Sequence, residues 1–304
     1  FDDRSISTMK SHLGKLDDSL ARGLIWASLW DSCRDGELAT SDYIAIALNA
    51  LKTESDISIV SATYLQFETA IWAYANPAKR DALRAQVADA TATMLAAATP
   101  GSDHQMQFAR AFANNAVTPS HFEKLKAILN GSENGLVIDA EIRWYIFICG
   151  VKRGIFGPTE IEAESARDNT AHGKQYTAYS YAAIPTKEAK TKAFNSITQD
   201  NLSNTIHAYM CRGFNENIHH ELLTDFVDQY FDAILKVWET KGFEIAETTA
   251  TLMFPTWVIS EDTVKKAQHW LDVTGKDASN ALRRSVTEGR DAMSRALKAR
   301  SADK

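Results

Sequence analysis

The sequence lacks any long uninterrupted run of apolar residues. Apolar residues make up 45% of the 304 positions, yet no run approaches the roughly 18 consecutive apolar residues that a membrane-spanning helix needs. We therefore expect a soluble, globular chain with no membrane among its partners.

Positive charge is also scarce. Lys and Arg together number 33 against 39 Asp and Glu, which gives a formal net charge of −6. A general nucleic-acid surface needs clustered positive charge that can displace counterions from phosphates. The charge balance therefore argues against a nucleic-acid partner. A net negative charge also gives no reason to expect an acidic substrate.

Cysteine is rare, and no two cysteines are close in the sequence. Cys33, Cys149 and Cys211 are widely separated and lie within apolar helical patterns. An odd count without a local pair is typical of reduced thiols in a protein core. Because reduced thiols persist inside cells, we expect a cytoplasmic protein.

Alternating apolar and polar residues, the pattern of a half-buried strand, are almost absent. Apolar residues instead recur at three and four positions, which predicts helices. Gly36, Gly131, Gly154, Gly213, Gly242 and Gly275 each stand where a helix is expected to end. Helices are expected at 16–35, 42–52, 56–74, 77–98, 103–115, 118–129, 174–183, 186–197, 202–212, 219–241, 243–254, 261–273 and 279–300.

Together with two helices in the segment 135–173, these ranges predict an all-α protein of about 15 helices. Short connections favour antiparallel helix hairpins, stacked as a degenerate HEAT-like or armadillo-like superhelical array with a concave face. In the helix at 16–35 we expect one face to carry Leu20, Leu24, Ala27, Trp30 and Cys33.

The segment 135–173 predicts two helices with a sharp break between them. Asp139 can cap the first, and Lys152, Arg153 and Gly154 suit its C-terminal end. Pro158 fits the first position of the second helix, where its missing N–H costs no hydrogen bond. The segment thus forms a helix-turn-helix unit.

The usual motifs of catalytic and metal sites are missing as well. A helical zinc site of the His-Glu-x-x-His type needs two histidines four residues apart, and the nearest sequence runs from His220 to Thr224. Threonine is a poor zinc ligand, so His219 and His220 are interpreted as exposed histidines. Asp225, Asp228 and Asp232 share one helix face, which favours a solvated acidic face over a magnesium site because no second Asp-rich motif accompanies them. We therefore assign no catalytic residue and no metal ligand.

Several sequence phrases resemble a known family. Residues 138–144 read Ile-Asp-x-Glu-x-Arg-Trp, 152–154 Lys-Arg-Gly, and 163–173 Ala-Glu-x-Ala-Arg-Asp-Asn-Thr-x-x-Gly, with Ala-Ala-Ile-Pro following at 182–185. A second match begins Leu-Asp-Asp-Ser-Leu-Ala-Arg-Gly at Leu16 and ends Arg-Asp-Gly-Glu-Leu. These phrases resemble the C-terminal helical domain of bacterial aminopeptidase N, of the M-one family of zinc metallopeptidases. That domain is similar to its counterpart in the endoplasmic-reticulum aminopeptidases, and the actinobacterial type resembles this chain most.

The resemblance implies that residues 1–304 are a single C-terminal domain of a longer aminopeptidase, with 1–15 as a linker from an upstream domain. The start at Phe1 instead of Met also suggests an excised piece. Zinc and peptide cleavage would belong to the upstream catalytic domain, since the Gly-x-Met-Glu-Asn motif is missing here. This chain would hold no cofactor and would be inactive alone. It would cover the active site and control the access of peptide substrates.

Two pairs of residues are candidates for substrate contact. The Arg143 guanidinium could hold a peptide carboxylate while Trp144 supplies an apolar wall, or Arg143 could pair with a neighbouring acid while Trp144 is buried. Arg167 and Asp168 have the same ambiguity, because polar residues near a helix end also satisfy backbone groups. A free-standing helical-repeat scaffold that binds proteins is the alternative function.

Overall fold

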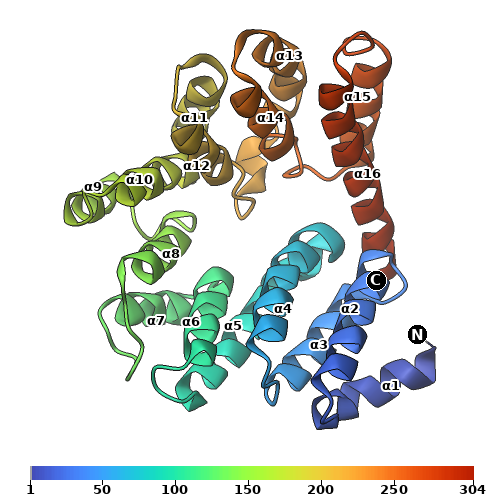
Figure 1. Ribbon diagram of the computed structural model, residues 1–304, viewed down its shortest axis with the longest axis vertical. Coiled ribbons are helices and arrows are strands. Elements are labelled where there is room, and N and C mark those ends of the chain that lie inside the picture. The colour runs from blue at the N-terminus through green and yellow to red at the C-terminus, as the bar shows by residue number, and fades with distance from the viewer. Residues whose placement is uncertain (1) are drawn as a thin grey trace. The chain divides into compact units, whose positions relative to one another are not determined.

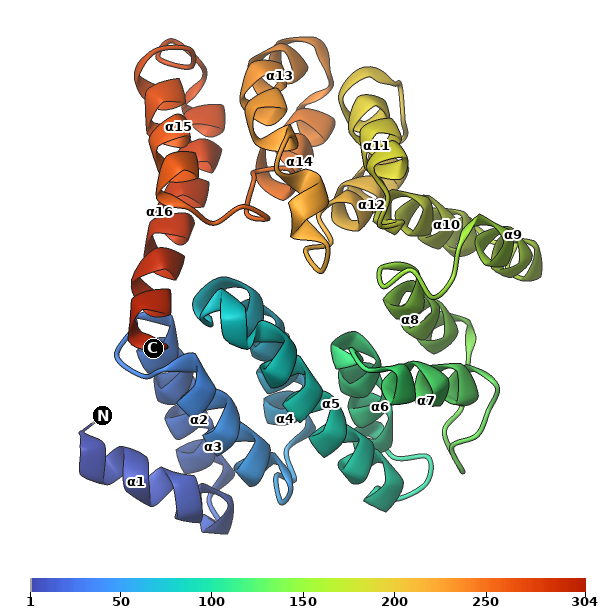
Figure 2. The same ribbon diagram turned by 180° about the vertical axis from the view of Figure 1, so that it is seen from behind.

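The computed structural model describes residues 2–304 (Figures 1 and 2). This part of the chain forms sixteen α-helices and no strand, which confirms the all-α prediction. The superhelical arrangement stays a prediction. Tertiary contacts divide the chain into two compact units: unit 1 holds residues 1–146 and 295–304, and unit 2 holds 147–294.

Unit 1 begins with seven helices. They are α1 (Asp3–His12), α2 (Ser19–Arg34), α3 (Thr40–Leu51), α4 (Ile57–Thr69), α5 (Arg80–Ala97), α6 (Asp103–Asn115) and α7 (Pro119–Leu129). A π-helical segment, η2 (Ala70–Tyr74), continues α4, and short 3₁₀ turns η1 (Leu13–Lys15) and η3 (Pro77–Lys79) lie before α2 and α5. Helix α8 (Ala140–Val151) starts in unit 1 and ends in unit 2.

Unit 2 contains the remaining helices. They are α9 (Pro158–Arg167), α10 (Ala171–Ala183), α11 (Lys187–Gln199), α12 (Asn204–Phe214), α13 (Phe226–Thr240), α14 (Phe243–Leu252) and α15 (Glu261–Asp272), with the 3₁₀ turn η4 (His220–Leu223) before α13. Helix α16 (Asn280–Ala302) starts in unit 2 and ends in unit 1. The expected helix at 219–241 is therefore interrupted, because η4 ends before α13 begins.

Local side-chain chemistry starts and ends many of these helices. Asp139 Oδ1 accepts a hydrogen bond of 2.9 Å from Ile142 N at the start of α8, as predicted. Gly36, Gly131 and Gly154 have φ of 71°, 80° and 72°, and so end helices in the left-handed conformation that glycine tolerates. Gly213 does not end a helix as expected. It lies inside α12, where an added Cβ would be 2.2 Å from the carbonyl oxygen of Tyr179 in α10.

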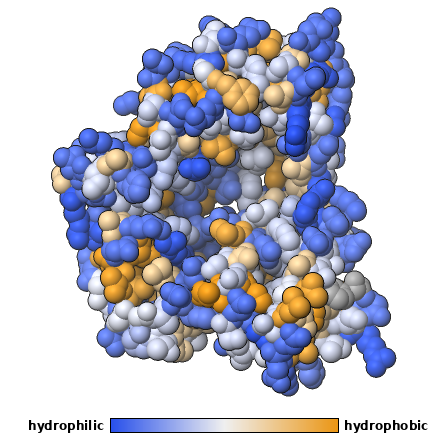
Figure 3. Space-filling model, in the orientation of Figure 1, coloured by the Kyte–Doolittle hydropathy of each residue, from blue (hydrophilic) through white to orange (hydrophobic). Residues whose placement is uncertain are grey.

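The buried face of α2 differs from the predicted one. Leu20 and Leu24 are 71% and 63% exposed, whereas Trp26, Leu29 and Cys33 are buried. The expectation that Leu20, Leu24, Ala27, Trp30 and Cys33 form one packing face is therefore wrong. Figure 3 shows hydrophobic residues in separate small patches on one side of the molecule, with hydrophilic residues between them.

The expected linker over residues 1–15 contains structure. Helix α1 packs against α3, and Lys10 Nζ forms an ion pair of 2.8 Å with Asp42 Oδ1. Asn49 Nδ2 also donates to the Lys10 carbonyl oxygen at 3.0 Å. Residues Asp3–His12 are therefore part of the fold of unit 1.

Residues 295–304 complete unit 1 from the other end of the chain. The Asp303 side chain is fully buried, and its carboxylate accepts hydrogen bonds from Ser41 N (3.1 Å), Ser41 Oγ (2.6 Å) and Asn76 N (2.9 Å). Lys79 Nζ lies 3.5 Å from the same group. Asp303 thus supplies negative charge at the N-terminal ends of α3 and η3, where helix dipoles favour it.

Candidate functional site

The structure places Arg143 and Trp144 near the start of α8. Trp144 has no exposed surface, so its indole belongs to the protein core. Arg143 is half-buried, and its Nη1 donates to the Leu129 carbonyl oxygen at 3.1 Å. The neighbouring Glu141 pairs with Arg110 at 2.7 Å. This geometry favours the packing interpretation of Trp144, and peptide contact by Arg143 stays a prediction.

Arg167 and Asp168 lie at the end of α9, in unit 2. The Arg167 side chain is exposed. Asp168 Oδ1 accepts hydrogen bonds from the Thr170 backbone N–H (3.3 Å) and hydroxyl (2.7 Å), and Thr170 in turn caps α10. Asp168 therefore organises the turn between two helices, and substrate contact by this pair stays a prediction.

The histidines and acidic residues of unit 2 make local contacts. His219 Nδ1 lies 3.3 Å from Glu221, and Lys187 and Lys266 form ion pairs with Asp225 and Asp228. Within residues 2–304, no three His, Cys, Asp or Glu side chains come together in a way that could hold a metal ion. The residues described here do not fit a zinc site.

A buried cysteine and histidine lie one turn apart on α12. Cys211 Sγ is 3.8 Å from the His207 ring, whose Nε2 lies 3.1 Å from Thr249 Oγ1. Burial raises the pKa of the Cys211 thiol and lowers the pKa of His207. Since a nucleophilic cysteine needs a thiolate, this pair is a packing contact. All three cysteines lie within the described residues and are buried, and none forms a disulfide.

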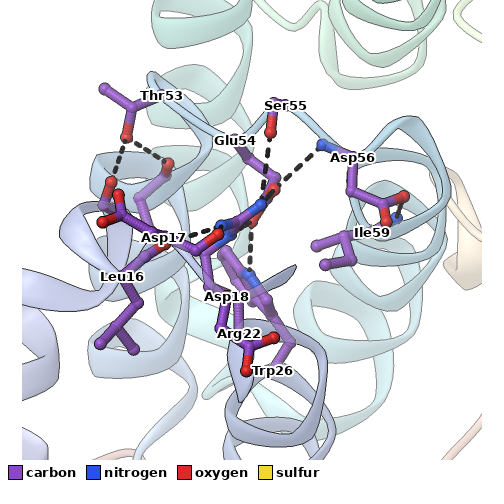
Figure 4. A network of polar contacts seen from close by, with 12 residues as sticks. Leu16, Asp17, Asp18, Arg22, Trp26, Thr53, Glu54, Ser55, Asp56 and Ile59 are labelled. Carbon is purple, nitrogen blue, oxygen red and sulfur yellow. Dashed lines mark hydrogen bonds and ion pairs between the residues drawn. The ribbon is translucent and has the colours of Figure 1, made fainter. Parts of the chain in front are cut away.

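Unit 1 contains a buried ion pair at the start of α2 (Figure 4). The guanidinium of Arg22 donates from Nε and Nη2 to Glu54 in the loop after α3, at 2.9–3.2 Å. Their side chains are 8% and 1% exposed. Arg22 Nη1 donates to the carbonyl oxygens of Leu16 and Asp17 at 2.7 and 3.1 Å.

Glu54 is held by further donors. Trp26 Nε1 and the Asp56 backbone N–H donate to its carboxylate at 3.1 and 3.0 Å. Burial raises the pKa of Glu54, but the hydrogen bonds from Arg22, Asp56 and Trp26 outweigh it and lower the pKa below its ordinary value. This network ties the entry of α2 to the entry of α4, so it supports the fold. The sequence motif at residues 16–26 contains Arg22, but sequence reasoning gave it no role.

A second polar network lies in unit 2. Glu216 accepts hydrogen bonds from Lys152 Nζ and from the Tyr179 hydroxyl. Burial raises the pKa of Glu216, but the charges of Lys152 and Lys190 and the hydrogen bonds from Tyr179 and Lys152 together outweigh burial and lower the pKa below its ordinary value. The buried Lys190 donates to the carbonyl oxygens of Ala182 (2.8 Å), Gly213 (3.0 Å) and Phe214 (3.0 Å), at the ends of α10 and α12. Sequence patterns did not indicate this network.

A small hollow in unit 1 combines charged, polar and aromatic side chains. It measures about 270 Å³ and lies along α4 and α6. Tyr64, Leu65 and Glu68 line it from α4, and Arg110 and Asn114 line it from α6. Tyr145 of α8 completes the wall. Sequence reasoning did not identify this hollow, because its members come from three separated helices.

No helix in the described part of the chain is both long enough and apolar enough to cross a membrane.

Comparison with known proteins shows which family the chain is related to. The family model of the ERAP1-like C-terminal domain matches residues 1–295. Aminopeptidase N of Streptomyces lividans is 40% identical over 305 residues, which cover 99% of this chain and 35% of that protein. The chain thus spans about a third of the length of this relative. The predicted resemblance is confirmed, and the chain belongs to the family of ERAP1-like C-terminal domains.

Proposed function

We propose that this chain is the non-catalytic C-terminal domain of a cytoplasmic, zinc-dependent aminopeptidase that releases N-terminal amino acids from peptides. In this role the helical domain covers the active site and controls which peptides reach it. The observation that carries the proposal is the 40% identity to aminopeptidase N over 99% of this chain.

Zinc and the cleavage step are assigned to the remainder of the enzyme. The histidine and acidic side chains described above contact lysines or one another, and the buried thiols have no metal-binding partner set in residues 2–304. A catalytic zinc site needs three protein ligands and an open position for water. The role left for this chain is therefore to shape access and to contact the distal part of the peptide, with Arg143, Arg167 and Asp168 as candidate contacts.

The surface of α2 supports a partner within the same polypeptide. Leu20 and Leu24 lie four residues apart within α2 and are 71% and 63% exposed. Residues four apart lie on the same side of a helix, so these two leucines form a short apolar stripe. Such stripes mark interaction sites on soluble proteins. We assign this leucine stripe to contact with the catalytic part of the enzyme.

The proposal is tested with the full-length enzyme and its two parts. The 304-residue chain alone is expected to release no p-nitroaniline from leucine p-nitroanilide, with or without added zinc. The complementary part is expected to be weakly active and to regain activity when the chain is added. Cleavage by the purified chain carrying stoichiometric zinc would disprove the assignment.

The alternative function, a free-standing scaffold, predicts a different result. A scaffold would bind protein partners and give no rescue of the complementary part. Access control is measured separately: the complementary part alone should cleave large unfolded proteins better, relative to short peptides, than the reassembled enzyme does. An unchanged ratio would contradict the access role while leaving the family assignment intact.

A further inference from the structure

The hollow between α4 and α6 has the features of a small-ligand site. Its volume of about 270 Å³ is just below the range typical of drug-sized ligands, so it suits a smaller molecule. Tyr64 and Ala111 are buried in its wall, and Leu65 is 69% exposed. The hollow is therefore partly apolar and open to solvent.

Opposite charges line the two sides of the hollow. Arg110 contributes a guanidinium from α6, and Glu68 contributes a carboxylate from α4. Asn114 Nδ2 donates a hydrogen bond to Glu68 Oε1, which places Glu68 beside the turn of α6 that follows Arg110. Four residues of helix rise about 6 Å, so the two charged groups lie on neighbouring turns.

The guanidinium of Arg110 is held in place by its neighbours, but not all of its N–H groups have a hydrogen-bond partner in residues 2–304. It lies 5.2 Å from the centre of the Tyr145 ring, and its Nη2 pairs with Glu141, whose side chain is 66% exposed. Arg110 Nε has no hydrogen-bond partner among the described residues. A guanidinium can hold a carboxylate through two parallel hydrogen bonds, so a ligand carboxylate can compete with the solvent-exposed Glu141.

The buried side chain of Asn115 is a second observation that indicates a ligand in the hollow. Asn115 is 2% exposed, lines the hollow and donates through Nδ2 to the Ala111 carbonyl oxygen at 2.9 Å. Its Oδ1 has no partner in the part of the chain that the structure describes. A buried acceptor without a partner is costly and indicates a missing donor, such as water or a ligand group.

We propose that this hollow binds a free apolar amino acid as its zwitterion. The α-carboxylate pairs with Arg110, the α-ammonium pairs with Glu68, and the side chain packs against Tyr64 and Leu65. A zwitterion can pair with both the guanidinium and the carboxylate that line the hollow, whereas a ligand with a single charge can pair with only one of them. The proposal concerns binding alone and does not depend on the aminopeptidase assignment.

The first test compares three ligands by isothermal titration calorimetry with the 304-residue chain. L-leucine is expected to bind. Leucinamide lacks the carboxylate and N-acetyl-leucine lacks the ammonium, so each should bind about tenfold or more weakly, as expected for a lost charged hydrogen bond. No saturable binding of leucine, or analogues that bind within twofold of it, would overturn the proposal.

Variants then assign each charge to its residue. Arg110→Gln should weaken leucine binding by about tenfold and remove the difference between leucine and leucinamide. The near-isosteric Glu68→Gln should remove the difference between leucine and N-acetyl-leucine. Arg34→Gln, an arginine of unit 1 whose side chain is 41% exposed and lies outside the hollow, is the matched control and should bind like the unaltered chain.

A third variant should act in the opposite direction. Glu141→Gln removes the exposed competitor for Arg110, so leucine should bind about two- to fivefold more tightly. Circular dichroism and the urea midpoint establish that each variant is folded before binding is compared. Weaker binding in Glu141→Gln, or unchanged selectivity in both Arg110→Gln and Glu68→Gln, would show that the ligand does not use these charges.

Discussion

Glu54 joins three parts of unit 1 through one carboxylate. It accepts hydrogen bonds from Arg22, from Trp26 and from the backbone of Asp56, and its side chain is 1% exposed. Removing one partner of a buried ion pair leaves the other charge without compensation. Glu54→Ala should therefore lower the free energy of unfolding by about 3 to 5 kcal/mol, measured by urea denaturation.

The control for Glu54 is an exposed ion pair in the same unit. Lys126 and Glu123 pair on the surface of α7, with side chains 44% and 74% exposed. Glu123→Ala should change the free energy of unfolding by less than about 1 kcal/mol. Equal losses in the two variants would show that the Glu54 network has no special importance.

Acid should weaken the same network. The folded-state pKa of Glu54 lies below its ordinary value of 4.5, so its contribution is complete above pH 4.5 and is lost as pH falls through the folded-state pKa. The unaltered chain should therefore lose more free energy of unfolding between pH 5 and pH 3 than Glu54→Gln does. Parallel curves would contradict this assignment.

Lys190 should give a pH dependence of the same sign, with stability rising as pH rises, but in a higher pH range. Burial lowers its pKa from 10.5 to about 7, so between these values the unfolded chain holds a proton that the folded chain releases. Stability supplied by this group is therefore smallest below pH 7 and rises toward pH 10.5. Lys190→Met also removes three hydrogen bonds to backbone carbonyls and should cost about 1 to 3 kcal/mol.

The Lys190 measurement needs stability curves at several pH values. Urea denaturation of the unaltered chain should show a rise between pH 7 and pH 9.5 that Lys190→Met lacks. Lys187, the exposed lysine one turn earlier on α11, is the matched control. Lys187→Met should keep the rise, and its disappearance there would assign the effect to surface charge.

Residue-scale prediction from sequence succeeded where the chemistry is local. The Asp139 cap contacts a residue three positions away, and Gly154 acts through its own backbone conformation, so both could be predicted. Arg22 and Glu54 are 32 positions apart, and a sequence pattern shows neither their proximity nor their burial. The hollow that contains Arg110 and Glu68 could not be predicted either, because its residues are also far apart in the sequence.

At the scale of elements, two helical glycines differ in the space available for a side chain. Gly213 of α12 faces α10, and a Cβ there would be 2.2 Å from the Tyr179 carbonyl oxygen, whereas Gly23 of α2 has nothing within 4 Å of that position. Gly213→Ala should force α10 and α12 apart and cost about 1 to 3 kcal/mol. Gly23→Ala should stabilise α2 by about 0.5 to 1 kcal/mol.

Thermal unfolding followed by circular dichroism measures both glycine variants. The midpoint should fall for Gly213→Ala and rise for Gly23→Ala. A rise in both would mean that helix propensity outweighs the close approach of α10 and α12.

Helix positions were predictable to within a few residues over most of the chain, because caps and apolar spacing are local signals. Predicted 103–115 and observed Asp103–Asn115 agree. Which face of a helix is buried was less predictable. In α2 the buried Arg22 occupies the packed side and the leucines Leu20 and Leu24 are exposed, since tertiary pairing with Glu54 overrides hydrophobicity.

At the scale of the whole molecule, substitutions in the leucine stripe should affect association with the catalytic part but not the stability of the chain. Leu20→Asp together with Leu24→Asp replaces exposed side chains, so the urea midpoint of the chain should change little. Association with the catalytic part should weaken by tenfold or more if the stripe is the contact surface, as expected for burying a charge in an apolar interface. Surface plasmon resonance measures this affinity.

The matched control for the stripe lies elsewhere on the chain. Leu65 is 69% exposed on α4, so Leu65→Asp introduces one negative charge outside the stripe and is matched to the single substitution Leu20→Asp. It should leave the affinity for the catalytic part unchanged. Equal weakening by both substitutions would show that added negative charge, and not the stripe, controls association.

The division of unit 1 between the two ends of the sequence has a consequence during biosynthesis. The Asp303 carboxylate is made 262 residues after Ser41 and 227 residues after Asn76, the two residues whose backbones it caps. At a translation rate of about 5 to 20 residues per second, the nascent helices α3 and η3 wait roughly 10 to 50 s for this partner. Unit 2 leaves the ribosome complete in sequence before unit 1 can close, so unit 1 stays without the Asp303 contacts until residues 295–304 are made.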